Sequence, residues 1–137
     1  MTKFKSLALA ALFMFSALPA QADENAARQI ITSQLESFIA GDYETAYTNA
    51  SPTIKSIFPT LDRFMSMVKQ GYDPVLRPGN YSFARTENLS DTRIVQEVLI
   101  RGPDGTDWTA IYFMQLQEDG TWKVDGVNLS SGAAGLT

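Results

Sequence analysis

The spacing of apolar residues changes in the middle of the chain, and this change constrains the fold more than any other feature. Between residues 24 and 70 the apolar side chains recur every three or four positions, which is the period of an amphipathic helix. From about residue 81 the pattern becomes that of strands separated by tight turns. Helices first and strands second indicate an α+β domain.

The first half of the chain contains start and stop signals for several helices. Ser51 and Thr60 stand where helix N-caps are needed, and Gly41 and Gly71 follow two of the apolar stripes. The stretch 72–79 holds two prolines and a glycine, so we expect an irregular connector there. The expected helical segments are Glu24–Ala40, Tyr43–Asn49, Thr53–Phe58 and Thr60–Gln70.

The second half predicts four strands in an antiparallel meander. The links between them are short, and two of them contain Asp-Gly, a strong signal for a tight turn. Residues 130–137 are small and polar, and we expect a flexible C-terminal tail there. The expected strands are Tyr81–Glu87, Thr92–Arg101, Asp107–Gln117 and Thr121–Leu129.

Both faces of the two central strands are largely apolar. A sheet with one face in water alternates more cleanly between apolar and polar residues. One face should receive the helices. The other is covered either by a partner subunit or by curvature of the sheet within one chain, and the sequence leaves both open. The candidate contacts in a homodimer are Val95, Leu99, Ile111 and Phe113.

Residues 1–22 have the three parts of a cleavable secretion signal. A short cationic start precedes an apolar run from Leu7 to Leu18, and a small-residue site ends at Ala22. We expect cleavage between Ala22 and Asp23, because a membrane-spanning helix needs roughly 20 apolar residues and this run is shorter. Residues 23–129 then form one domain in the periplasm or outside a bacterial cell, with no membrane association after the signal is removed.

The chain has no histidine and no cysteine. It therefore lacks the residues of Ser-His-Asp and Cys-His catalysis and of nearly every common zinc site. Nine basic and fifteen acidic residues remain after residue 22, which gives a charge of −6, and the basic residues are scattered. This distribution argues against nucleic acid as a partner. We expect no cofactor, no metal and no catalytic motif.

Several stretches resemble a known family. The sequence 38–47, in which a helix ends in Gly-Asp before a short helix, is similar to the opening of the cone-shaped nuclear transport factor 2-like superfamily. The stretches 50–58, 64–68, 71–75, 104–108 and 119–122 resemble a family of small bacterial proteins called domain of unknown function 4864. The resemblance covers residues 26–129. It implies the conical α+β fold and brings no activity with it.

The two aromatic-rich sheet faces, together with the lack of histidine and cysteine, lead us to expect a non-enzymatic domain with a conical pocket that binds a small, partly apolar ligand. Gln96, a polar residue on an apolar strand face, is a candidate anchor for that ligand, and Tyr47, Tyr112, Trp108 and Trp122 are the other candidate ligand-binding residues. Packing in the core is the alternative role for the two tryptophans, and hydrogen bonding to a neighbouring side chain or water for Gln96.

Two alternatives remain for function. The first is an interaction protein that forms a homodimer through the outer sheet face. The second is an isomerase or hydrolase that pairs an acid with a tyrosine, as the resemblance to ketosteroid isomerase-like enzymes implies. The candidate carboxylates are Asp42, Glu97 and Asp125, and the further candidate tyrosines are Tyr43 and Tyr72.

Overall fold

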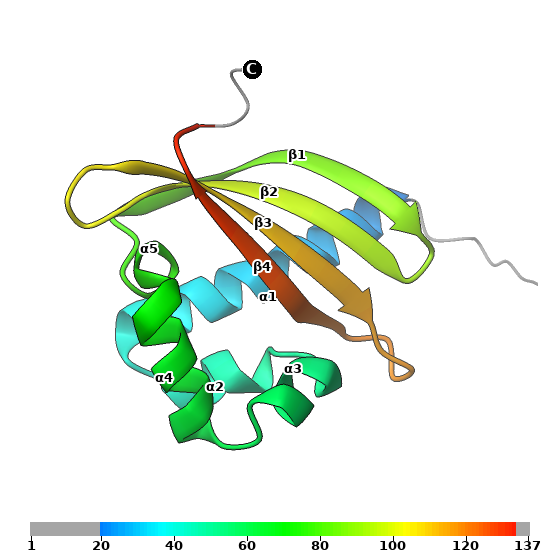
Figure 1. The fold of residues 1–137 in the computed structure, drawn as a ribbon. Coiled ribbons are helices and arrows are strands. Elements are labelled where there is room, and N and C mark those ends of the chain that lie inside the picture. Colours follow the sequence, from blue (N-terminus) through cyan, green and yellow to red (C-terminus); the bar gives the residue numbers. More distant parts are fainter. Residues whose placement is uncertain (1–19, 134–137) are drawn as a thin grey trace, which may run out of the picture.

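The computed structural model describes residues 20–133, which form five helices and a four-stranded antiparallel sheet (Figure 1). The strand order is β1-β2-β3-β4, so each strand pairs with its neighbours in sequence, as the meander prediction required. Helix α1 runs across one face of the sheet, and the shorter helices gather at one end of it (Figure 1). The predicted α+β architecture is confirmed.

The helices are α1 (Ala20–Ala40), α2 (Tyr43–Thr48), α3 (Pro52–Ile57), α4 (Leu61–Gly71) and α5 (Asp73–Leu76). Three of them begin at a side chain that accepts a hydrogen bond from a backbone N–H of the first turn. Asp42 caps α2, Ser51 caps α3 and Thr60 caps α4. The predicted roles of Ser51 and Thr60 are therefore confirmed.

Helix α5 corrects the expectation of an irregular connector over residues 72–79. Pro74 lies in the first turn of this helix, where proline costs no hydrogen bond. The Arg77 guanidinium donates to the Asp73 carboxylate, and Pro74, Val75 and Leu76 are buried. This helical turn forms because it buries three apolar residues. The prolines and glycine of the segment indicate only its local conformational preference, and they do not indicate this burial.

The strands are β1 (Asn80–Ser90), β2 (Arg93–Arg101), β3 (Asp107–Leu116) and β4 (Trp122–Ser131). Gly105 and Gly120 adopt positive φ in the two Asp-Gly turns, at 84° and 89°. Strand β4 continues past the expected boundary at residue 130, because Ser130 and Ser131 pair with β3. These two residues therefore belong to the sheet rather than to a tail.

Three irregularities interrupt the strand pairing of the sheet. The register of β1 against β2 shifts between Phe83 and Thr86 and again between Asn88 and Ser90, and the register of β4 against β3 shifts at Asp125. Such bulges increase the local twist of a strand. They curve the sheet around the helices, as the conical fold requires.

The two faces of the sheet differ in burial. The alternate residues of β2 that face the helices are buried, and those on the opposite face, such as Val95 and Leu99, are half-buried. On that outer face the Phe113 side chain remains 38% exposed. Within the described residues no helix covers this face (Figure 1), and its apolar side chains are half-buried or exposed.

The secretion signal lies outside the described residues, apart from its last positions. Helix α1 begins at Ala20, and the predicted cleavage site between Ala22 and Asp23 falls in its first turn. No helix in the described part of the chain is long and apolar enough to cross a membrane. The signal and the periplasmic location stay predictions.

Candidate functional site

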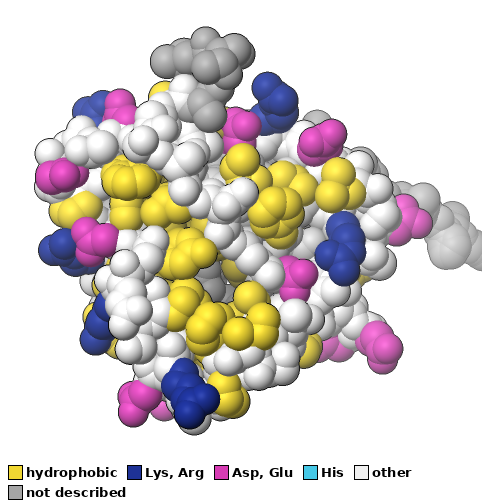
Figure 2. Space-filling model, in the orientation of Figure 1, with side chains coloured by type: hydrophobic (Ala, Val, Ile, Leu, Met, Phe, Trp, Pro, Cys, Tyr) yellow, Lys and Arg dark blue, Asp and Glu magenta, His cyan; other side chains and the backbone are white. Residues whose placement is uncertain are grey.

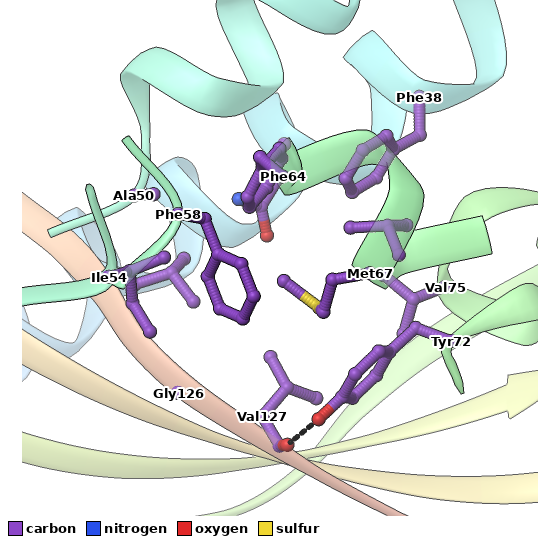
Figure 3. A pocket seen from close by; sticks show the side chains of 13 residues that line it. Phe38, Ala50, Ile54, Phe58, Phe64, Met67, Tyr72, Val75, Gly126 and Val127 are labelled. Carbon is purple, nitrogen blue, oxygen red and sulfur yellow. Dashed lines mark hydrogen bonds between the residues drawn. The ribbon is translucent and has the colours of Figure 1, made fainter. Parts of the chain in front are cut away.

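A cavity of about 220 Å³ lies between the helices and the edge strand β4. In Figure 2, hydrophobic side chains surround a hollow between β4 and helices α3 and α4, and Figure 3 shows the cavity from close by. Almost all of its lining is aliphatic or aromatic. The lining residues are Gln34, Phe38, Ala50, Ile54, Phe58, Phe64, Met67, Val68, Tyr72, Val75, Val124, Gly126 and Val127.

One wall is α3, which a short parallel bridge fixes to the edge of the sheet. The Ser51 N–H donates to the Val124 carbonyl at 2.9 Å, and the Val124 N–H donates to the Asn49 carbonyl at 2.8 Å. The Ser51 hydroxyl caps α3 and also donates to Asp125 Oδ1 at 2.7 Å. These contacts hold α3 against β4, so that Ile54 and Phe58 face the cavity (Figure 3).

The opposite wall is α4 together with the residue that ends it. Phe64, Met67 and Val68 recur at helical spacing and line the cavity from one side of α4. The Tyr72 hydroxyl donates to the Val127 carbonyl at 3.2 Å, which joins the end of α4 to β4 (Figure 3). The cavity therefore has walls from segments that are far apart in sequence.

Gln34 is the one amide side chain that lines the cavity. It projects from α1 and is 3% exposed, and its Nε2 donates to the Ala46 carbonyl at 3.0 Å. Its Oε1 accepts no hydrogen bond from the described residues. In that part of the chain, Tyr112 Oη is the only side-chain nitrogen or oxygen that has neither a hydrogen-bond partner nor solvent-accessible surface. Gln34 Oε1 has no partner either, so it must keep some accessible surface. The cavity supplies the open space beside it.

Among the residues that the structure describes, no aspartate, glutamate, lysine or arginine lines the cavity. Of its lining residues, only Tyr72 carries a titratable group, and its hydroxyl is bonded to Val127. Within residues 20–133, no cluster of three or more acidic side chains is placed to hold a metal ion. The arrangement can hold an uncharged molecule, and it offers no carboxylate for proton transfer to one.

The model of one protein family matches residues 20–134, and its description is Domain of unknown function (DUF4864). The chain belongs to this family. The predicted resemblance is thereby confirmed. No curated protein is significantly similar to the chain.

Two solved structures share the fold of this DUF4864 domain. One is an NTF2-like protein of unknown function from Shewanella baltica OS155, with 12% identity, a TM-score of 0.59, and coverage of 85% of this chain and 99% of that one. The other is a domain of unknown function with a cystatin-like fold from Nostoc punctiforme PCC 73102, with 16% identity, a TM-score of 0.58, and coverage of 82% and 78%. At these identities the likeness establishes the nuclear transport factor 2-like fold alone.

Gln96, the predicted ligand anchor of the DUF4864 domain, fills the bulge in β1 instead of lining the cavity. Its Nε2 donates to the carbonyls of Arg85 and Glu97, and its Oε1 accepts from Thr86 and from Arg28 on α1. The side chain is fully buried. Its amide therefore has protein partners for both atoms, which matches the alternative role.

Tyr47 and Tyr112, the two tyrosines among the predicted ligand-binding residues, also lie outside the lining of the cavity. The Tyr47 hydroxyl donates to the Phe58 carbonyl at 2.5 Å, and its ring packs on Phe64 with 5.0 Å between centroids. Tyr47 thus supports the wall from behind. Tyr112 is fully buried on the helix-facing side of β3, and burial raises the pKa of its hydroxyl.

The two tryptophans of the DUF4864 domain occupy different environments. Trp122 is buried in the core at the start of β4, as the packing alternative proposed. Trp108 is half-buried and borders two shallow surface depressions, one of them beside Pro74 and Pro103. The structure does not bring the five predicted ligand-binding residues together in one cavity.

The candidate carboxylates have structural partners. Asp42 caps α2, and its hydrogen bonds from the Thr45 hydroxyl and N–H lower the pKa of this exposed group. Asp125 accepts from Ser51 and lies 3.6 Å from the Arg93 guanidinium. Glu97 lies on the outer face of the sheet, beside Val95 and Leu99. None of the three lines the cavity.

Gln34 was not among the predicted ligand-binding residues, although the sequence contains a signal for it. Gln34 interrupts the apolar stripe of α1 between Ile31 and Leu35, just as Gln96 interrupts the apolar face of β2. The same criterion that selected Gln96 applies to Gln34. Only the packed structure distinguishes the glutamine with a free acceptor from the one whose amide is fully used.

Proposed function

We propose that this domain is a non-enzymatic binding protein that holds a small apolar molecule in the cavity between α3, α4 and β4. The observation that carries the proposal is the cavity itself, which has an almost wholly apolar lining and about 220 Å³ of space. An engineered apolar cavity of roughly 150 Å³ is large enough to bind benzene. A substituted ring or a short branched chain fits the larger volume.

Burial of apolar surface is the driving force that such a lining supplies. Each buried methylene of a ligand contributes about 0.8 kcal/mol, so a ligand of this size is held at micromolar to millimolar concentration. The absence of charged lining residues favours this use over the acid–tyrosine alternative, which needs a carboxylate within about 3 Å of the reacting proton.

Export of the protein belongs to the same proposal. The secretion signal of residues 1–22 supports binding of a ligand in the periplasm. Amino-terminal sequencing of protein recovered from the periplasmic fraction tests this part. A chain that starts at Asp23 supports export, and an uncut chain in the cytosol contradicts it.

A pair of tryptophan substitutions on one helix tests binding in the cavity. Ile54 lines the cavity, whereas Ile57, three residues later on α3, is 59% exposed and lies outside it. The probe is 4-propyltoluene, followed by nuclear magnetic resonance titration. Ile54→Trp fills the cavity and should weaken binding at least about tenfold, because it removes the apolar space the probe occupies.

Ile57→Trp is the matched control and should bind the probe like the parent protein. Equal binding by both variants would place the probe elsewhere. No binding to the parent protein at millimolar probe would contradict the proposed function.

The outer face of the sheet supports a second candidate function, assembly as a homodimer. Phe113 is 38% exposed on a face that also carries the half-buried side chains Val95, Leu99 and Ile111, and Figure 2 shows hydrophobic side chains gathered over β2 and β3. Exposed apolar surface on a sheet face is typical of protein interfaces. Light scattering at high micromolar concentration should give twice the monomer mass, and Phe113→Lys should halve it. A monomeric mass for the parent protein contradicts this candidate.

A further inference from the structure

In the described part of the chain, one side-chain polar atom of the cavity lining has no hydrogen-bond partner. Gln34 Oε1 accepts no hydrogen bond from the described residues, although the Gln34 side chain is 97% buried and lines the cavity. A ligand that displaces water from this acceptor without offering a donor leaves it unpaired, which costs free energy. A ligand that brings a donor avoids this cost, so the atom discriminates between ligands of the same shape.

The orientation of the Gln34 amide specifies which kind of polar group the ligand needs. One N–H of its Nε2 donates to the Ala46 carbonyl at 3.0 Å, which fixes the orientation of the amide and leaves the oxygen as the side-chain atom that has no hydrogen-bond partner among the described residues. An oxygen of this kind accepts and cannot donate. The complementary group is therefore a donor, such as a hydroxyl.

The rest of the lining restricts the charge of the ligand. No acidic or basic side chain from residues 20–133 lines the cavity, and the Tyr72 hydroxyl donates to the Val127 carbonyl. A carboxylate would meet the negative end of the Gln34 amide dipole, and an ammonium would have one acceptor and no counter-charge. Burial of an unpaired charge is far more costly than burial of a hydroxyl that has a partner.

We infer that the cavity binds a neutral, largely apolar molecule with one hydroxyl group, which donates to Gln34 Oε1. The inference rests on the proposed function and narrows its ligand class. The volume of about 220 Å³ suits a benzene-sized ring with a short alkyl chain, so an alkylphenol is the simplest member of the class.

A comparison of two ligands with the same shape tests the inference. The probes are 4-propylphenol and 4-propyltoluene, which differ only by a hydroxyl in place of a methyl group. Their Kd values are measured by nuclear magnetic resonance titration for the parent protein and for Gln34→Met, which keeps the length of the side chain and removes the acceptor. The Kd of 4-propylphenol divided by the Kd of 4-propyltoluene should be about tenfold larger for Gln34→Met than for the parent protein.

An unchanged ratio overturns the inference and leaves the proposed function standing, provided that 4-propyltoluene still binds and Ile54→Trp still weakens it. Failure of both probes to bind the parent protein overturns the proposed function and the inference with it. Binding of 4-propylbenzoate as tight as that of 4-propylphenol also overturns the inference, because a buried carboxylate has no partner there.

A measurement on the parent protein covers the case in which Gln34→Met does not fold. The side-chain amide resonances of Gln34 should shift markedly when 4-propylphenol binds, and much less when 4-propyltoluene binds. Equal shifts with both probes contradict a hydrogen bond to this side chain. Ile57→Trp, whose substitution lies outside the cavity, should give the parent response.

Discussion

Two tyrosine hydroxyls of the helix-facing side differ in whether they have a partner. Tyr112 Oη is buried in the core and has no hydrogen-bond partner among residues 20–133, whereas the Tyr72 hydroxyl donates to the Val127 carbonyl. A buried hydroxyl without a partner loses its hydrogen bonds to water, and no hydrogen bond within the protein replaces them. Tyr112 is therefore held in place by the packing of its ring.

Tyr112→Phe should raise the free energy of unfolding by about 1 kcal/mol, because it removes a polar atom that burial penalises. Tyr72→Phe is the matched comparison, and it should lower the free energy of unfolding by about 1 kcal/mol because a hydrogen bond is lost. Urea denaturation measures both. A destabilised Tyr112→Phe variant would show that the hydroxyl has a partner in solution, such as a buried water.

At the scale of the elements, α3 is a short helix whose position depends on one serine. The fully buried Ser51 caps the helix, donates to Asp125 at the β4 bulge, and lies in the bridge between Ala50 and Val124. A six-residue helix is not stable alone in water. These contacts therefore decide where α3 stands and whether the cavity has a wall on this side.

Ser51→Ala should lower the free energy of unfolding by about 1–2 kcal/mol, since both the cap and the bond to Asp125 are lost. Hydrogen exchange should become faster in α3, and binding of 4-propyltoluene should weaken. Ser56→Ala, an exposed change on the same helix, should stay within about 0.5 kcal/mol of the parent. Unchanged exchange in α3 of Ser51→Ala would contradict the role given to this serine.

At the scale of the whole molecule, α1 and the sheet are joined by polar contacts at both ends of the helix. Asn88 donates to Glu24 near the start of α1, and the Tyr81 hydroxyl donates to Glu36 Oε2 at 2.5 Å near its end. Burial, together with the hydrogen bond and negative charge of Glu36, raises the pKa of Tyr81 to about 12. The attachment of α1 to β1 therefore depends on a protonated tyrosine.

Stability should decrease in alkaline solution for this reason. An unfolded tyrosine ionises near pH 10, whereas folded Tyr81 keeps its proton to about pH 12. The unfolded state therefore releases its proton first, and the contribution of Tyr81 is complete below about pH 10 and is lost as the pH rises through 12.

Chemical denaturation between pH 8 and pH 12 tests this contribution. Tyr81→Phe should lose less stability over the upper part of this range than the parent protein. Tyr43→Phe, which removes a hydroxyl that bonds to none of the described residues, should follow the parent curve. Parallel curves for the parent and Tyr81→Phe would contradict the raised pKa.

Local signals in the sequence were sufficient for most of the secondary structure. Helix caps at Ser51 and Thr60 and tight turns at Gly105 and Gly120 depend on a few neighbouring residues, and all are found as predicted. The order of helices and strands and the antiparallel pairing follow from periodicity and from short links. The α+β fold could therefore be predicted from the sequence alone.

The candidate site depended on contacts that sequence spacing does not contain. Helix α5 forms because it buries Pro74, Val75 and Leu76, and the bulges at β1 and β4 become visible only when the strands pair. The position of Phe58 and Met67 on facing walls requires α3 and α4 to be packed against β4. Side chains from distant segments meet only in the tertiary structure.

The hydrogen bonding of two glutamines shows which property the sequence determined and which one depended on the tertiary structure. Gln34 and Gln96 each interrupt an apolar stripe, so the sequence by itself places a polar amide on an apolar face at both positions. The Gln96 amide nitrogen donates to a carbonyl of the β1 bulge, and its oxygen accepts from the side chains of Thr86 and Arg28. Both polar atoms of this amide therefore have protein partners. The amide of Gln34 meets one carbonyl and a cavity. The physical reason is that hydrogen-bond satisfaction depends on neighbours that only packing brings together.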